Sequence, residues 1–198
     1  CKDISQRAVT KYLERINKRR EEAKKRSFKT YQWEIPESRE YNEAANRAIP
    51  EMKNHALLPF IQQKEASTPE QHFEEFLETY TDNIDWWYKN GDEGKQHYAI
   101  PYTTMSGTQG LFYVDFVIRM KNGQIFLFDT KSINSDMEAP NKHNALIDYV
   151  NSEANAQLHL KGGVIIEDKG LWKYAPMKIE NTNDLTNWET FFPDNYKN

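Results

Sequence analysis

The chain has 198 residues, which is the length of one domain or slightly more. Hydrophobic residues make up 38%, aromatic residues 13% and charged residues 28%, a composition too polar for a membrane protein and too aromatic for a disordered one. No apolar run approaches the roughly 20 residues that cross a bilayer, and no signal peptide is present. The single cysteine, Cys1, excludes a disulfide framework and a cysteine-rich zinc site, and it favours a reducing cytoplasm. Because the first residue is not methionine, we expect the chain to be part of a longer protein.

The net charge of −4 is unevenly distributed. Residues 1–29 hold 11 Lys and Arg against 4 Asp and Glu, whereas residues 30–198 hold 15 against 26. A basic leader on an acidic body indicates a nucleic-acid contact or a charged linker, and a solvated surface helix is an equal alternative for the leader alone.

The first part of the chain is predicted to be helical. Apolar residues recur at helical spacing at the start of Asp3 to Arg26, and the second half of that segment is polar all round. Tyr41 to Phe60 has a weak helical pattern that Pro50 and Pro59 limit. Residues 1–62 are therefore expected to form an N-terminal helical extension or a linker from another domain.

The second part, residues 63–198, has the pattern of an α/β domain. Thr68-Pro69-Glu70 predicts the start of a helix, because Thr can cap it and Pro suits its first position. Aromatic and β-branched residues then predict strands, and one further helix follows at 141–158. The predicted strands cover 86–88, 99–102, 111–119, 125–133, 163–166 and 171–174. The order of helix, strands, helix and strands predicts a mixed β-sheet flanked by helices.

Two carboxylates and a lysine lie inside otherwise apolar predicted strands. Asp115 interrupts the run 112–118, and Asp129 and Lys131 interrupt the run 125–133. Burying ions in a sheet is costly unless they form pairs or bind metal. Asp129 and Lys131 are two residues apart, so they share one face of a strand.

The loop between the two strands decides whether Asp115 joins that face. A two-residue Asn122-Gly123 turn would place Asp115 opposite Thr130, pointing away from Asp129. A three-residue loop with Gly123 in a left-handed conformation would instead place Asp115 opposite Asp129, with Cβ atoms roughly 5 Å apart. We choose the three-residue loop because it also collects a coherent core. That core would comprise Phe112, Val114, Phe116, Ile118, Phe126 and Phe128, and Tyr113 would face Lys131.

Two neighbouring carboxylates repel each other unless positive charge neutralises them. Lys131 supplies one charge, and a divalent cation with oxygen ligands, Mg²⁺ or Mn²⁺, would supply the rest. Such an ion polarises a phosphoryl oxygen and lowers the pKa of a bound water, which Lys131 would hold or help to deprotonate. The alternative is a plain ion pair of Asp129 with Lys131, with Asp115 incidental.

These residues resemble the PD-(D/E)xK nuclease superfamily, in which an aspartate on one strand precedes an acid-x-Lys motif on the next. The surrounding motifs resemble the C-terminal endonuclease domain of type III restriction subunits and related DEAD/DEAH-type helicases. They are Ser67-x-x-Glu70-x-x-Phe73, Trp86-Trp87-Tyr88-Lys89-Asn90, Ala99-Ile100-Pro101-Tyr102, Phe112-Tyr113-Val114-Asp115-Phe116, Asp129-Thr130-Lys131, Lys142 before Ala145-Leu146, and Gly162-Gly163-Val164. The resemblance covers about Trp33 to Trp172, and it departs from the family at Val114, where the motif usually has proline.

The resemblance implies a restriction-endonuclease-like fold and a Mg²⁺-dependent endodeoxyribonuclease with catalytic residues Asp115, Asp129 and Lys131. It also implies a carboxylate from the preceding helix, for which Glu70 matches the family spacing, with Glu74 second. Asp115, Asp129, Glu70 and the backbone carbonyl of Thr130 would be the metal ligands. An acid at a helix start is the ordinary alternative for each glutamate. Lys142 would contact a phosphate, or would be an exposed lysine at a helix end.

The implied partners are DNA, a methyltransferase or specificity subunit, and a helicase domain in the same protein. No Walker A pattern occurs in the sequence, so ATP would serve only a motor domain absent from this chain. A restriction-modification role is expected, and a nuclease in DNA repair or plasmid processing is a narrower alternative. A catalytically degenerate nuclease fold that docks DNA or a partner of a helicase is the second hypothesis. The basic leader and the exposed-looking Trp33, Trp86 and Trp87 motivate it.

Overall fold

The structure is a computed structural model that describes residues 11–15, 17–18, 33–91, 97–132 and 137–196. Its strands are β1 (Asn46–Ile49), β2 (Phe60–Gln63), β3 (Ile84–Lys89), β4 (Ala99–Thr103), β5 (Gln109–Tyr113), β6 (Phe116–Met120), β7 (Ile125–Thr130), β8 (Leu160–Asp168), β9 (Leu171–Tyr174) and β10 (Glu189–Thr190). The helices are α2 (Thr68–Thr79), α3 (Ala139–Val150), and two 3₁₀ helices, η1 (Glu153–Leu158) and η2 (Pro193–Tyr196).

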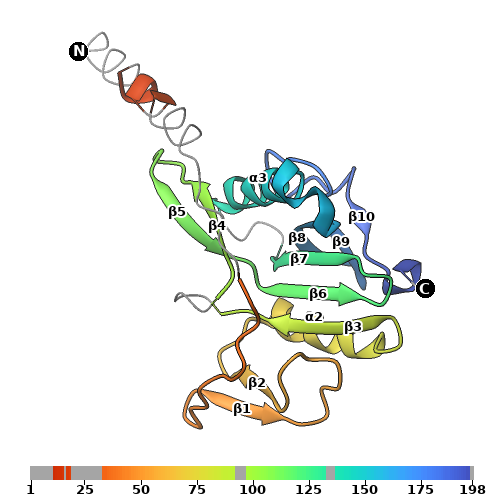
Figure 1. Ribbon diagram of the computed structural model, residues 1–198. Helices are drawn as coiled ribbons and strands as arrows, with labels where there is room; N and C mark the ends of the chain where they lie inside the picture. Colours follow the sequence, from red (N-terminus) through yellow and green to blue (C-terminus); the bar gives the residue numbers. More distant parts are fainter. Residues whose placement is uncertain (1–10, 16, 19–32, 92–96, 133–136, 197–198) are drawn as a thin grey trace.

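A mixed six-stranded sheet forms the centre of the molecule (Figure 1), in the order β10-β9-β8-β7-β6-β3. Neighbouring strands are antiparallel except β7 and β8, which are parallel and are joined through α3. Two separate two-stranded sheets, β1-β2 and β4-β5, complete the described strands. The mixed α/β sheet flanked by helices that the sequence predicts is therefore present.

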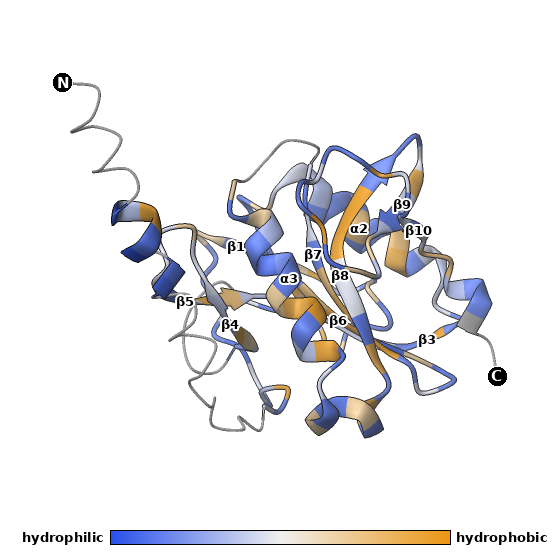
Figure 2. Cartoon of the chain, turned by 90° about the horizontal axis from the view of Figure 1, so that it is seen from above, coloured by the Kyte–Doolittle hydropathy of each residue, from blue (hydrophilic) through white to orange (hydrophobic). Residues whose placement is uncertain are grey.

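The two helices cover opposite faces of this sheet (Figures 1 and 2). On one face, Phe73 and Leu77 of α2 pack in a buried cluster with Phe116 and Phe128. The other face is covered by α3 and the β4-β5 hairpin, whose buried residues include Ile100, Phe112, Leu146 and Val150. The strand β8 runs between both layers with a hydrophobic stretch at its centre (Figure 2).

Helix α2 begins where the sequence predicts, although Ser67 caps it rather than Thr68. The Ser67 hydroxyl accepts a hydrogen bond from the Glu70 backbone, and the Glu70 carboxylate accepts one from the Ser67 backbone at 2.8 Å. This reciprocal capping box satisfies two backbone groups at the helix start. It also fixes the Glu70 carboxylate at the end of the helix that faces the sheet.

The hairpin between β6 and β7 has the three-residue connection that the sequence favours. Phe116 pairs with Phe128 and Arg119 with Ile125, and the Met120 backbone donates to the Gln124 carbonyl at 2.9 Å. Gly123 has a φ of +87°, in the left-handed region. The predicted register is confirmed.

The predicted continuous strand 111–119 is wrong, because the chain bends at Val114 and Asp115. The part before the bend, β5, pairs with β4, so Tyr113 lies opposite Ala99 and does not face Lys131. Phe112 and Val114 consequently belong to the cluster beneath α3, whereas the other four predicted core residues belong to the cluster beneath α2. The bend divides one predicted core between the two faces of the sheet.

The segment 41–60 is also different from the prediction, because it contains β1 and the start of β2 rather than a helix. The predicted helix 141–158 ends at Val150, and a 3₁₀ helix follows. Strand β7 ends at Thr130, earlier than predicted. The predicted helix 3–26 is helical at the described residues 11–15 and 17–18, and its other positions lie outside the described residues. Among the described residues, no helix has the length and apolar character needed to cross a membrane.

The expected division of the chain at residues 62 and 63 falls inside β2. Met52 and Phe60, on the N-terminal side of this division, are buried in the same cluster as Phe73. The β1-β2 hairpin therefore packs on the α2 face of the central sheet.

Candidate functional site

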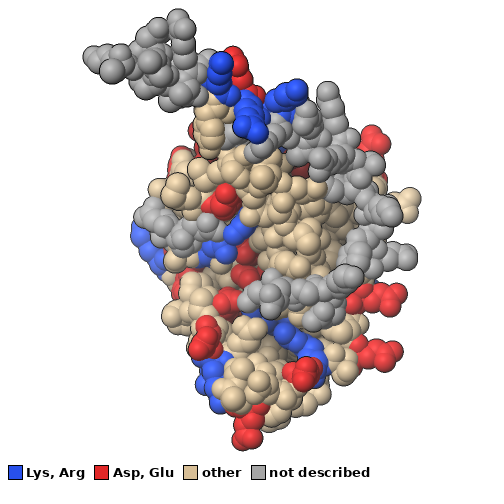
Figure 3. Space-filling view, turned by 90° about the vertical axis from the view of Figure 1, so that its left-hand side faces the viewer, with Lys and Arg blue, Asp and Glu red and all other residues tan. Residues whose placement is uncertain are grey.

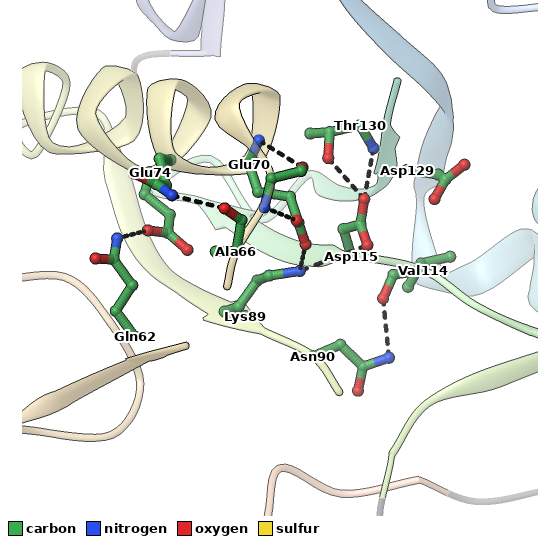
Figure 4. Close-up of polar contacts among 12 residues, drawn as sticks. Gln62, Ala66, Glu70, Glu74, Lys89, Asn90, Val114, Asp115, Asp129 and Thr130 are labelled. Atoms are coloured by element: carbon green, nitrogen blue, oxygen red, sulfur yellow. Dashed lines mark hydrogen bonds and ion pairs between the residues drawn. The ribbon is translucent and has the colours of Figure 1, made fainter. Parts of the chain in front are cut away.

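The candidate residues come together at the end of the central sheet where β3 and β7 finish and β6 begins. Helix α2 starts beside the same end and contributes Glu70, the bend before β6 contributes Asp115, and the end of β7 contributes Asp129 (Figure 4). Figure 3 looks onto this end of the molecule and shows acidic side chains near the middle of the face, with Lys and Arg beside them.

The Asp115 carboxylate is held by the end of β7. Its Oδ2 accepts hydrogen bonds from the Thr130 backbone N–H and the Thr130 hydroxyl, both at 2.7 Å. Its backbone carbonyl accepts from Asn90 at 2.8 Å, which continues the pairing of β3 with β6. Asp115 therefore ties together three strand ends, and its side chain is only 14% exposed.

A buried lysine lies between the Glu70 and Asp115 carboxylates. The Lys89 ammonium is 2.5 Å from Glu70 Oε1 and 3.4 Å from Asp115 Oδ1 (Figure 4). It also lies 4.8 Å from the centre of the Phe116 ring, within the range of a cation–π contact. The lysine thus links the helix carboxylate to the strand carboxylate.

Asp129 and Lys131 form an ion pair at the end of β7, a contact that both interpretations of the sequence allow. The Lys131 ammonium is 3.1 Å from Asp129 Oδ1 and 3.0 Å from Oδ2. Only the contact with Oδ1 has hydrogen-bond geometry, so no donor among the described residues is aligned with the buried Oδ2. Asp129 is 2% exposed, so this oxygen is a buried acceptor that water does not satisfy freely.

The two aspartates titrate in opposite directions because their surroundings differ. Burial and the negative charge of Asp115 raise the pKa of Asp129 to about 7, and Lys131 only partly opposes them. Burial acts in the same direction on Asp115, but Lys89, Lys131 and the hydrogen bonds from Thr130 outweigh it and hold the pKa of Asp115 below its ordinary value. The aspartates are thus close enough to repel each other, and Asp115 keeps the charge.

Glu70 and Glu74 have different surroundings although they are one helical turn apart. Burial would raise the pKa of Glu70, but Lys89 and the hydrogen bond from Ser67 lower it overall. Glu74 is turned toward β2, where its carboxylate accepts a hydrogen bond from Gln62, and burial raises its pKa to about 7. Of the two candidate glutamates, the one that contacts the cluster is Glu70.

Two residues without a predicted role, Lys89 and Asn90, help to form the site. Lys89 is the buried cation described above. The Asn90 side chain donates to the carbonyls of Tyr98 at 2.8 Å and Val114 at 2.9 Å, and it accepts from the Tyr98 backbone at 3.0 Å. These bonds hold the bend before Asp115 against the start of β4. A lysine and an asparagine directly after three aromatic strand residues were the sequence signal for both.

Other predicted positions lie near the cluster or away from it. Lys142 is in the first turn of α3, and its positive charge lowers the pKa of Asp129. Trp87 is fully buried in the cluster beneath α2, so the expectation that it is exposed is wrong, whereas Trp33 and Trp86 are half-buried. The basic leader lies mostly outside the described residues.

The donor set suits a hard divalent cation. The cluster offers carboxylate oxygens from three chain segments and no histidine or cysteine, which is the chemistry that Mg²⁺ and Mn²⁺ prefer. The buried Oδ2 of Asp129 is an acceptor that such an ion would satisfy. In their present arrangement, however, the described residues include no group of three or more His, Cys, Asp or Glu side chains spaced to hold a metal ion.

Comparison of the chain with protein-family models, with curated proteins and with solved structures gives no match. The geometry of the cluster and the sequence motifs are therefore the basis for a functional proposal.

Proposed function

We propose that residues 63–198 form a metal-dependent DNA endonuclease domain of the PD-(D/E)xK type, within a type III restriction enzyme-like, helicase-linked protein. The observation that carries the proposal is the meeting of Glu70, Asp115, Asp129 and Lys131 at one end of a mixed sheet. The four side chains come from three separate parts of the chain. Asp115, Asp129 and Lys131 follow the order of the nuclease motif, in which one acid precedes an acid-x-Lys sequence.

In this proposal, Asp115 and Asp129 hold a Mg²⁺ ion, with Glu70 and the Thr130 carbonyl completing the protein ligands; Mn²⁺ is a substitute. The bound ion supplies Lewis acidity toward a phosphoryl oxygen and lowers the pKa of a coordinated water. The proximity of the two aspartates supports this assignment, because they repel each other unless positive charge lies between them.

Lys131 is the proposed residue that handles the attacking water. Its ammonium is anchored to Asp129, and its side chain is 21% exposed, so Lys131 is not fully enclosed. From there it would orient the water, help to remove its proton and offset the negative charge that develops on the phosphate. Lys142, whose charge already acts on Asp129, would contact a neighbouring phosphate of the substrate.

The experiment is a cleavage assay with Mg²⁺ on the whole helicase-linked protein and its methyltransferase or specificity partner. Asp129→Asn and Lys131→Met are each expected to lower the cleavage rate by roughly a hundredfold or more, the size expected when a group that stabilises transition-state charge is removed. The control is Lys173→Met, which removes one lysine from a surface pair with Asp168. A cleavage rate for either site variant equal to that of the control would contradict the proposal.

A second candidate function is a degenerate nuclease fold that docks DNA or a partner protein. The observation that favours it is the Lys89 ammonium, which lies between Glu70 and Asp115 where a divalent ion would bind. Titration calorimetry with Mn²⁺ separates the two candidates. Heat of binding that disappears in Asp129→Asn supports the nuclease, and the absence of binding to any variant of the cluster supports the docking module.

A further inference from the structure

Lys89 is a buried cation at the end of β3, and its side chain is only 9% exposed. An ammonium group is rarely buried to this extent without carboxylate partners, because the loss of hydration is costly. Among the described residues, its carboxylate partners are Glu70 at 2.5 Å and Asp115 at 3.4 Å, and it also contacts the face of the Phe116 ring.

The backbone of Lys89 is fixed from both sides, so the position of its side chain is built into the fold. Its N–H donates to Nε2 of His55 at 3.1 Å, and its carbonyl accepts from the Arg39 guanidinium at 3.0 Å. Burial lowers the pKa of His55 to about 4, so this histidine is a neutral acceptor at ordinary pH. These backbone hydrogen bonds therefore hold Lys89 where its ammonium reaches the Glu70 and Asp115 carboxylates.

Glu70 and Asp115 cannot pair with the Lys89 ammonium and coordinate a divalent ion between them at the same time. Two cations that share a pair of buried carboxylates repel each other strongly at a separation of a few ångströms. Binding of the ion to these carboxylates therefore requires the ammonium to move away. Lys131 is different, because its ammonium pairs with Asp129.

We propose that Lys89 is an internal counterion that holds Glu70 and Asp115 together in the metal-free protein and competes with the divalent cation for them. This inference rests on the proposed function, because it takes the cluster to be a metal site. It assigns distinct tasks to the two lysines: Lys131 belongs to the reaction, and Lys89 is a positioning residue that sets how readily the cation enters.

The test is calorimetric titration of Mn²⁺ into the wild-type chain, Lys89→Met and Lys173→Met. Methionine keeps the unbranched shape of lysine and removes its charge. Removing the competitor should tighten Mn²⁺ binding by roughly tenfold or more, and it should lower the metal-free melting temperature because two buried carboxylates lose their cation. The surface variant Lys173→Met should match the wild type in both measurements.

The outcomes separate this inference from the proposed function. Tighter binding by Lys89→Met supports the inference, including the case in which the wild type does not bind. Equal or weaker binding by Lys89→Met overturns the inference and leaves the metal site intact. No binding by either protein overturns both.

A measurement on the wild type covers the case in which Lys89→Met does not fold. The ammonium protons of Lys89 should be slow to exchange with water in the metal-free protein, and NMR of lysine side chains detects this protection. Saturating Mg²⁺ should release the ammonium and abolish its protection. Unchanged protection at saturating Mg²⁺ would overturn the inference.

Discussion

Asp129 has its pKa raised to about 7 by burial and by the negative charge of Asp115, against an ordinary value of 3.8. Between these two pH values the folded chain holds a proton at Asp129 that the unfolded chain has lost. The stability contributed by Asp129 is therefore greatest at low pH, and it falls as the pH rises toward 7. A carboxylate suited to a metal is thus a source of instability in the metal-free protein.

Asp129→Asn is accordingly expected to raise the melting temperature of the metal-free chain by a few degrees at pH 8, because it removes a buried charge that the fold disfavours. At pH 5 the gain should be smaller, because the stability that the wild-type carboxyl contributes falls progressively as the pH rises from 3.8 to 7. Thermal unfolding with a chelator at both pH values checks this. Asp168→Asn is the control, since its surface pair with Lys173 lowers the pKa of Asp168 and predicts no such gain.

Glu70 and Glu74 provide a matched pair on one helix. Glu70→Gln should weaken Mn²⁺ binding by about tenfold, the usual size for the loss of one charged interaction, whereas Glu74→Gln should leave it unchanged because Glu74 bonds to Gln62. Calorimetric titration of both variants measures the difference. Equal Mn²⁺ affinities of the two variants would contradict the assignment of Glu70 as a metal ligand.

At the scale of elements, the bend between β5 and β6 depends on Asn90. Asn90→Ala removes three hydrogen bonds from a buried position and leaves their backbone partners unsatisfied. The expected loss of unfolding free energy is about 2–4 kcal/mol, with weaker Mn²⁺ binding because Asp115 is no longer held. Urea unfolding measures the loss, and Asn155→Ala, which removes a single bond to Tyr149, should have a smaller effect.

The hairpin of β6 and β7 depends on the left-handed conformation of Gly123. Apart from Gly123 and its two chain neighbours, no atom of the described residues lies within 4 Å of a Cβ added at this position, so Gly123→Ala tests the conformation alone. We expect it to lower the free energy of unfolding by about 1–2 kcal/mol. Denaturant unfolding beside Lys121→Ala, a neighbouring substitution on the same loop, provides the comparison. An unchanged stability would show that the loop does not need a left-handed residue.

Part of the fold and of the candidate site was predictable from the sequence. The register was predictable because Gly123 allows a left-handed residue and the alternating apolar residues fix the faces. The bend at Val114 was not, because no glycine or proline marks it and the residues on both sides suit a strand. The position of Lys89 directly after three aromatic strand residues marks it in the sequence, but its pairing with two carboxylates depends on burial by segments distant in sequence, such as the loop that contains His55.

At the scale of the whole molecule, the net negative charge of residues 30–198 disfavours binding of the proposed substrate, DNA. Residues 30–198 carry 11 more acidic than basic residues, and phosphate binding depends on Lys and Arg. The isolated chain should therefore bind and cleave duplex DNA weakly, and activity should return when the helicase and methyltransferase parts are present. Gel-shift and cleavage assays at several salt concentrations compare the two preparations. Full activity of the isolated chain would contradict this expectation.

The β4-β5 hairpin forms a sheet of its own, and it is packed on the α3 face of the central sheet and joined to β6 through the bend before Asp115. Its length is therefore independent of the register between β6 and β7. Residues added in pairs or removed in pairs at its tip, Thr104–Thr108, would change how far the hairpin extends without shifting the aspartates. Evolution can consequently adjust the reach of this arm while the carboxylate cluster stays in place.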